Sequence, residues 1–140
     1  MSFYGALAVL GGPALAKRDA TREFAVQAAR TCGDERCTNV IVLDLRDLSG
    51  VADYFVIATG SSDRQIRTAA EQVLGLGKEQ GRRPLGVDGV QYSHWVLIDY
   101  GDVVVHVFAP DYREIYDLEL LWGDAPRVRW ERRTASKPSE

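Results

Sequence analysis

The sequence predicts an α/β domain in which a mixed sheet of about five strands is flanked by helices. Five short apolar runs, rich in β-branched and aromatic residues, have the length and composition of strands. They lie at residues 40–45, 54–59, 85–87, 94–98 and 103–108. Two longer segments, 19–31 and 62–81, carry apolar residues at helical spacing. The last two strands are almost continuously apolar, which indicates burial on both faces beneath helices rather than an all-β barrel.

The N-terminal half is expected to run helix, strand, strand, helix. Helix 19–31 ends just before Gly33, a residue that suits the end of a helix. The two strands that follow are separated by a polar turn at 47–50 and read as buried. Ser62 and Gln65 have the spacing of a capping box, so the second helix is expected to open directly from the second strand.

The C-terminal half is expected to form a hairpin followed by a short helical piece. Its two strands are joined across residues 99–102, where Gly101 supplies the positive φ of a tight turn. Pro110 can begin a last helix that runs to Asp117. Beyond it, the expected apolar anchors are Leu118, Leu121 and Trp122.

We divide the chain into an N-terminal extension at 1–17, one domain at 18–123 and a basic, polar C-terminal tail at 124–140. The first sixteen residues are uncharged, but they lack a basic start and are interrupted by Gly11-Gly12-Pro13, so we expect no signal peptide and no membrane span. Cys32 and Cys37 have no histidine near them in sequence, which favours free thiols over a zinc site. These features predict a cytoplasmic protein.

Charge is distributed unevenly along the chain. Residues 88–124 hold eight carboxylates and one strong base, Arg113, a net charge of −7, whereas the whole chain carries −3 and the remainder therefore +4. The same segment is rich in tyrosine and tryptophan. Such a surface suits a basic partner and repels phosphate backbones, although a solvated acidic face without any partner carries the same charge.

Three features admit a catalytic interpretation. Residues 60–62, at a strand end and a helix start, are compatible with an anion site, although a capping serine there is more often structural. His106 is expected to be hydrogen bonded and half buried on its strand rather than a proton-transfer group. A magnesium site would require convergence of strand-borne carboxylates. The candidates are Asp44, Asp53, Asp99 and Asp102.

Over most of residues 20–123 the sequence resembles the ribosomal silencing factor (RsfS) family, also called Iojap-like proteins. The resemblance lies in VIVLDLRDLSGVADYFVIATGSS at 40–62, LGVDGVQYSHWVLIDYGDVVVHVF at 85–108 and REIYDLELLW at 113–122. It implies a nucleotidyltransferase-like topology without catalysis, and often a homodimer. Family members bind the large ribosomal subunit through its fourteenth protein and obstruct joining of the small subunit when nutrients are short. Organellar relatives act in large-subunit assembly.

From this resemblance and the charge pattern we expect a binding protein with no catalytic residue, metal or cofactor. Tyr116 and Trp122 would supply apolar contact, and the carboxylates would steer a basic partner. The expected partner-binding residues are Asp99, Tyr100, Asp102, His106, Arg113, Tyr116, Asp117, Glu119 and Trp122. The basic tail is expected either to touch ribosomal RNA or to be disordered and solvated. The alternatives are a magnesium-dependent nucleotidyltransferase-type enzyme, a large-subunit assembly factor and an RNA-binding module.

Overall fold

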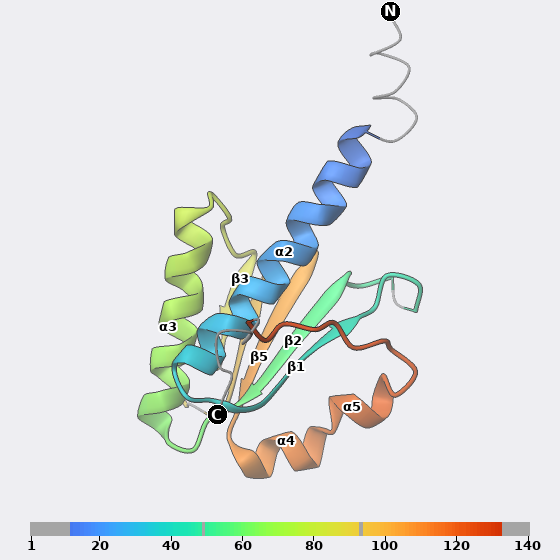
Figure 1. Cartoon of the computed structure of the whole chain (residues 1–140). Coiled ribbons are helices and arrows are strands. Elements are labelled where there is room, and N and C mark those ends of the chain that lie inside the picture. The colour runs from blue at the N-terminus through green and yellow to red at the C-terminus, as the bar shows by residue number, and fades with distance from the viewer. Residues whose placement is uncertain (1–11, 49, 93, 133–140) are drawn as a thin grey trace, which may run out of the picture.

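The computed structural model describes residues 12–48, 50–92 and 94–132. Figure 1 shows one sheet with long helices on one side and two short helices near its lower end. In chain order the elements are α2 (Gly12–Asp34), β1 (Thr38–Asp44), β2 (Tyr54–Thr59), α3 (Asp63–Glu79), β3 (Gly86–Asp88), β4 (Trp95–Asp99), β5 (Val103–Phe108), α4 (Pro110–Tyr116) and α5 (Leu118–Leu121).

The sheet is mixed and has five strands, as the sequence predicts. Its order is β1-β2-β5-β4-β3, in which β2 and β5 run parallel and every other pair is antiparallel. Gly101 joins β4 to β5 at a φ of +89°, which confirms the predicted turn residue. The strands keep the predicted order, and their bounds differ from the predicted ones by two residues or fewer.

α2 and α3 cover one face of the sheet and form the larger core with it. α3 begins as predicted, because the Ser62 hydroxyl accepts a hydrogen bond of 3.1 Å from the Gln65 amide. In a standard capping box the Gln65 side chain would bond back to the amide of Ser62, the N-cap residue, but here it bonds to Ser61. Gln65 Oε1 accepts from the backbone amide of Ser61 at 2.5 Å and from its hydroxyl at 3.0 Å, so the whole turn is closed by its own side chains.

α4 and α5 cover part of the opposite face of the sheet. This second core holds the outward side chains of β1, β2 and β5, including Leu43, Phe55 and Phe108. Asp117 separates the two helices at a φ of +22°, and its carboxylate caps α5 by accepting from the Leu120 amide at 3.2 Å. Two helices of seven and four residues are too short to bury all of their apolar side chains.

The predicted start of the first helix is wrong. α2 begins at Gly12, so the last residues of the expected N-terminal extension already belong to the helix. The rest of that extension, residues 1–11, lies outside the described residues. None of the helices in the described part of the chain is both long enough and apolar enough to span a membrane.

Residues 124–132 pack against the domain, so the prediction of a disordered, solvated tail is wrong for this part of it. We call these residues the C-terminal strap; residues 133–140 lie outside the described part. The Asp44 amide donates to the Pro126 carbonyl at 2.8 Å, and the Val128 amide donates to the Val42 carbonyl at 2.9 Å. The strap therefore runs antiparallel to β1, with Arg127 opposite Leu43.

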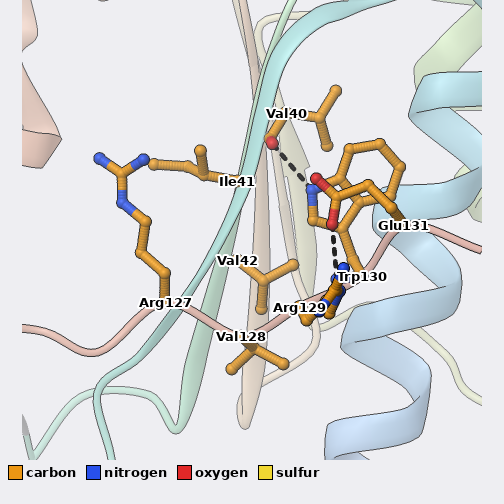
Figure 2. A pocket seen from close by; sticks show the side chains of 8 residues that line it. All are labelled: Val40, Ile41, Val42, Arg127, Val128, Arg129, Trp130 and Glu131. Atoms are coloured by element: carbon orange, nitrogen blue, oxygen red, sulfur yellow. Dashed lines mark hydrogen bonds between the residues drawn. The ribbon is translucent and has the colours of Figure 1, made fainter.

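The far end of the strap is fastened by Trp130. Its indole N–H donates to the Val40 carbonyl at 2.9 Å, as Figure 2 shows, and Arg30 of α2 donates to the Trp130 carbonyl at 2.8 Å. The indole also lies over Gly33, where an added Cβ would come within 3.1 Å of the ring. Arg132 then pairs with Asp34 at 2.7 Å. The strap thus ties the last turn of α2 to β1.

Candidate partner-binding surface

A row of rings in stacked, tilted and edge-on contact occupies the sheet face beneath α4 and α5. Trp95 lies at its centre, with ring centroids 4.8 Å from Phe108, 4.7 Å from Tyr116 and 5.9 Å from His106. Phe55 continues the row from His106, at 4.6 Å, to Trp122, at 6.3 Å. Residues from β2, β4, β5, α4 and the end of α5 therefore meet in one layer. Its rim is exposed, because Trp95 and Trp122 are only partly buried and Tyr116 is 49% exposed.

His106 is buried within this row, more deeply than the sequence predicts. Its Nδ1 accepts a hydrogen bond of 3.1 Å from the Trp95 indole N–H, so in the neutral ring the proton is carried by Nε2. That nitrogen is buried and has no hydrogen-bond partner. Burial lowers the pKa of His106 to about 3, and the ring is therefore neutral at ordinary pH. The side chain is 3% exposed, and its hydrogen bond positions Trp95.

The buried histidine predicts a specific loss of stability in mild acid. The unfolded chain takes up a proton near the ordinary pKa of 6.5, whereas the folded protein resists it down to about 3. The unfolding free energy that neutral His106 contributes is thus fully present above pH 6.5. Below that pH it decreases by about 1.4 kcal/mol per pH unit. We expect urea unfolding to show about 2 kcal/mol less stability at pH 5 than at pH 7.

His106→Asn should remove most of this pH dependence, because the amide can accept the Trp95 bond but does not titrate. His94→Asn is the matched control, since His94 is exposed on the same face and should leave the dependence unchanged. An unchanged acid profile in the His106→Asn variant would show that His106 is not the group responsible.

Arg113 anchors α4 to its surroundings. The side chain is only 10% exposed; its Nε donates to Glu119 at 3.0 Å, and its Nη1 donates to the Thr59 hydroxyl at 2.8 Å and to the Asn39 carbonyl. These partners lie on α5, β2 and β1. We call this group of contacts the Arg113 clamp. Its guanidinium is therefore used within the fold, and its contact with a partner stays a prediction.

Apolar side chains project from α4 and α5 into solvent. Leu120 is 78% exposed, and Ile115 and Leu121 are each 69% exposed. The prediction that Leu121 anchors the chain is therefore wrong, whereas Leu118 and Trp122 do pack against the core as predicted. Together with Tyr116 and Trp122, these three residues form what we call the α4–α5 surface. A cluster of large exposed apolar side chains is typical of an interaction site.

An acidic pocket of about 460 Å³ borders this surface. Glu114, Asp117 and Glu119 line it together with Arg113 and Arg127. The Arg113 clamp and a longer contact of 3.9 Å from Arg127 both engage Glu119, while Glu114 and Asp117 are exposed. Carboxylates beside exposed apolar groups are suited to a basic side chain flanked by apolar contacts.

Asp99 and Asp102, the expected contact residues of the hairpin, lie away from the α4–α5 surface. β5 leads away from the hairpin turn toward α4, and a strand of six residues spans about 20 Å. Asp99 accepts from the Gly101 amide at 2.7 Å, and Asp102 is held by Arg82 at 3.0 Å and by Thr21 at 3.0 Å. Both carboxylates are therefore engaged in the fold, far from the α4–α5 surface.

Tyr100, another of the expected contact residues, is a buried core residue. It is 8% exposed, and its ring meets Phe24 edge-on at 4.9 Å. A Cβ at Gly77 would lie 2.6 Å from the Tyr100 hydroxyl, so the glycine makes room for this ring between α2 and α3. Of the nine expected residues, those on the α4–α5 side with exposed or partly exposed side chains are Tyr116, Asp117, Glu119 and Trp122.

The catalytic alternative needs both the strand carboxylates and residues 60–62, and these two groups lie far apart in the fold. Asp44 and Asp53 lie beside the start of β2, where Asp44 pairs with Tyr54, whereas Gly60 follows its end. The Gly60 amide donates to the Phe108 carbonyl at 2.9 Å, and the Ser61 amide is bound by Gln65. Among the described residues no three acidic, histidine or cysteine side chains are grouped to hold a metal ion. The Asp53 amide donates to the Asp102 carbonyl at 2.8 Å, so these carboxylates and residues 60–62 lie at opposite ends of β2.

The fold and this surface define a small α/β domain in which two short helices expose apolar, aromatic and acidic side chains over one face of the sheet. Residues 18–140 match the family model described as "Ribosomal silencing factor during starvation". The chain therefore belongs to the ribosomal silencing factor family. The match reaches beyond residue 123 and includes the C-terminal strap.

Individual relatives agree with the family match. The chain is 46% identical over 99 residues to the ribosomal silencing factor RsfS of Bacillus subtilis, which covers 71% of this chain and 84% of the relative. A solved structure of a protein from Chromobacterium violaceum is 34% identical, with a TM-score of 0.68, over 84% of this chain and 94% of that one. A more distant relative is the mouse protein named mitochondrial assembly of ribosomal large subunit protein 1, 29% identical over 63% of this chain and 40% of the relative.

Proposed function

We propose that this chain binds the large ribosomal subunit in the cytoplasm through its fourteenth protein, and that the bound chain blocks joining of the small subunit. Translation would then be repressed when nutrients are limiting. The proposal rests on family membership together with the α4–α5 surface, which exposes Ile115, Leu120 and Leu121 beside an acidic pocket. Inhibition of this kind is steric and needs no turnover.

The chemistry of the surface supports a basic protein as the partner. Ribosomal proteins are rich in lysine and arginine, and the acidic pocket can accept such a side chain while the neighbouring apolar groups are desolvated. Tyr116, Asp117, Glu119 and Trp122 are the proposed contacts. Ribosomal RNA is a less suitable partner for this surface, because carboxylates repel its phosphates.

Co-sedimentation with purified large subunits tests the proposal. The chain should pellet with large subunits, and increasing amounts should lower the yield of complete ribosomes when small subunits are added. Undiminished joining at saturating protein would contradict steric silencing. Binding to large-subunit precursors alone, without an effect on joining, would favour the assembly role that the name of the mouse relative suggests.

Two further expectations belong to this proposal. The free chain is expected to be a homodimer, which light scattering can test. Contact of the tail with ribosomal RNA is expected from the exposed Arg129 and from residues beyond the strap, because Arg132 pairs with Asp34 and Arg127 lies near Glu119. Removal of residues 133–140, which leaves the strap in place, together with Arg129→Ala should therefore remove any RNA contribution to binding.

A further inference from the structure

Two cysteines meet where α2 ends. The Cys37 amide donates to the Cys32 carbonyl at 3.0 Å, and the Arg36 amide donates to the Gly33 carbonyl at 2.9 Å. Arg36 has a φ of +68°, so the helix ends through a left-handed residue. These two bonds define a Schellman motif, in which the side chains at the positions of Cys32 and Cys37 commonly touch. The sequence spacing of five, uninformative by itself, therefore places the cysteines in contact.

Both thiols are free and lie in the same core cluster, where the Cys32 thiol donates one hydrogen bond to the Cys37 sulfur. Cys32 is fully buried, whereas Cys37 is 9% exposed. The hydrogen bond from the Cys32 thiol lowers the pKa of Cys37, while its bond to Cys37 and its own burial raise the pKa of Cys32. The more accessible sulfur is thus also the one that more readily becomes a thiolate.

We propose that Cys32 and Cys37 are a reversible oxidation site, which hydrogen peroxide converts into an intramolecular disulfide. The disulfide would form within one helix cap, since the backbones are already joined by a hydrogen bond and both side chains belong to the same core cluster. Neither cysteine belongs to the α4–α5 surface, so this inference does not depend on the proposed function.

The reaction proceeds in two balanced steps. The Cys37 thiolate attacks one peroxide oxygen and breaks the O–O bond, which yields a sulfenic acid and, after protonation, one water. The Cys32 sulfur then attacks the Cys37 sulfur; the S–S bond forms, the S–O bond breaks, and the hydroxide leaves with the Cys32 proton as a second water. The two thiols lose two electrons in total, and the peroxide gains them.

Oxidation at this site would reinforce the attachment of the C-terminal strap. Arg30 and Asp34, which hold Trp130 and Arg132, lie on the same last turn of α2 as Cys32. A disulfide across the cap restricts the unfolded chain and opposes fraying of that turn. We expect the oxidised protein to melt roughly 5 °C higher than the reduced protein. The Val128 amide, bonded to β1, should exchange its hydrogen more slowly.

Treatment of the full chain with an equimolar amount of hydrogen peroxide tests the site. Intact mass should fall by the mass of two hydrogen atoms, the thiols should resist alkylation after denaturation, and dithiothreitol should reverse both changes. In Cys32→Ala, which has no second thiol, Cys37 should stop at a sulfenic acid that dimedone captures. In Cys37→Ala, the buried Cys32 should remain reduced.

Three results would overturn the proposal. The first is a wild-type chain whose two thiols are both still alkylated after peroxide treatment. The second is a disulfide that links two chains instead of closing within one. The third is equal capture by dimedone in the wild-type chain and in Cys32→Ala, which would show that Cys32 does not resolve the sulfenic acid.

Discussion

Ile115→Ser and Leu120→Ser are each expected to weaken binding to large ribosomal subunits by about tenfold to a hundredfold. Burial of one large aliphatic side chain contributes about 1.5 to 3 kcal/mol, and these two are 69% and 78% exposed in the free chain. Because neither side chain packs in the core, the unfolding free energy should change by less than about 0.5 kcal/mol. Quantitative pelleting and urea unfolding of the same preparations separate the two effects.

Leu85→Ser is the matched control for this experiment. Leu85 is 76% exposed, as much as Leu120, but it lies beside the hairpin turn, where its amide donates to the Asp99 carbonyl. Its replacement should leave ribosome binding unchanged. Equal losses in Leu85→Ser and Leu120→Ser would show that the α4–α5 surface is not the docking site.

Arg113→Met is expected to lower the unfolding free energy by about 3 kcal/mol, because it leaves Glu119, Thr59 and the Asn39 carbonyl without their shared donor. Arg113→Lys keeps the positive charge but lacks the planar guanidinium group, so it should recover only part of the lost unfolding free energy. Urea unfolding at pH 7 provides the measurement. Ribosome binding should weaken as well, since the clamp sets the position of α4 and α5.

Arg132→Met provides the comparison for the Arg113 clamp. Arg132 also pairs with one carboxylate, that of Asp34, but both side chains are largely exposed, so its replacement should have little effect on stability. If the two methionine variants were equally stable, the clamp would contribute no more than a surface ion pair.

Features with local causes were predicted well from the sequence. Ser62 begins α3 and Gly101 turns the hairpin because each effect depends on a residue and its close neighbours. The mixed sheet followed from five short apolar runs. The site was harder to predict, since Tyr100 resembles a surface residue in an acidic segment and His106 was expected to be only half buried. Whether they are buried depends on α2, α3, α4 and β2, which are distant in sequence.

The sequence of the strap contains a strand pattern that its charge composition does not reveal. In residues 127–131 the apolar Val128 and Trp130 alternate with charged residues, which is the period-two pattern of a strand. The abundance of arginine favoured a solvated tail instead. Conversely, Leu121 has the spacing of a buried helical residue, but α5 has only four residues and contacts the sheet on one side. Helix periodicity carries little information over such a length.

The placement of the strap determines how other molecules can recognise this protein. β1, at one margin of the sheet, has its outward carbonyl and amide groups bonded to the strap, and β3, at the other, is only three residues long. In the described part of the chain neither margin offers a long free template for β-strand addition. Side chains of the faces and helices are therefore better suited to recognition than a sheet edge in this part of the chain. The same arrangement discourages copies of the chain from joining edge to edge into a continuous sheet.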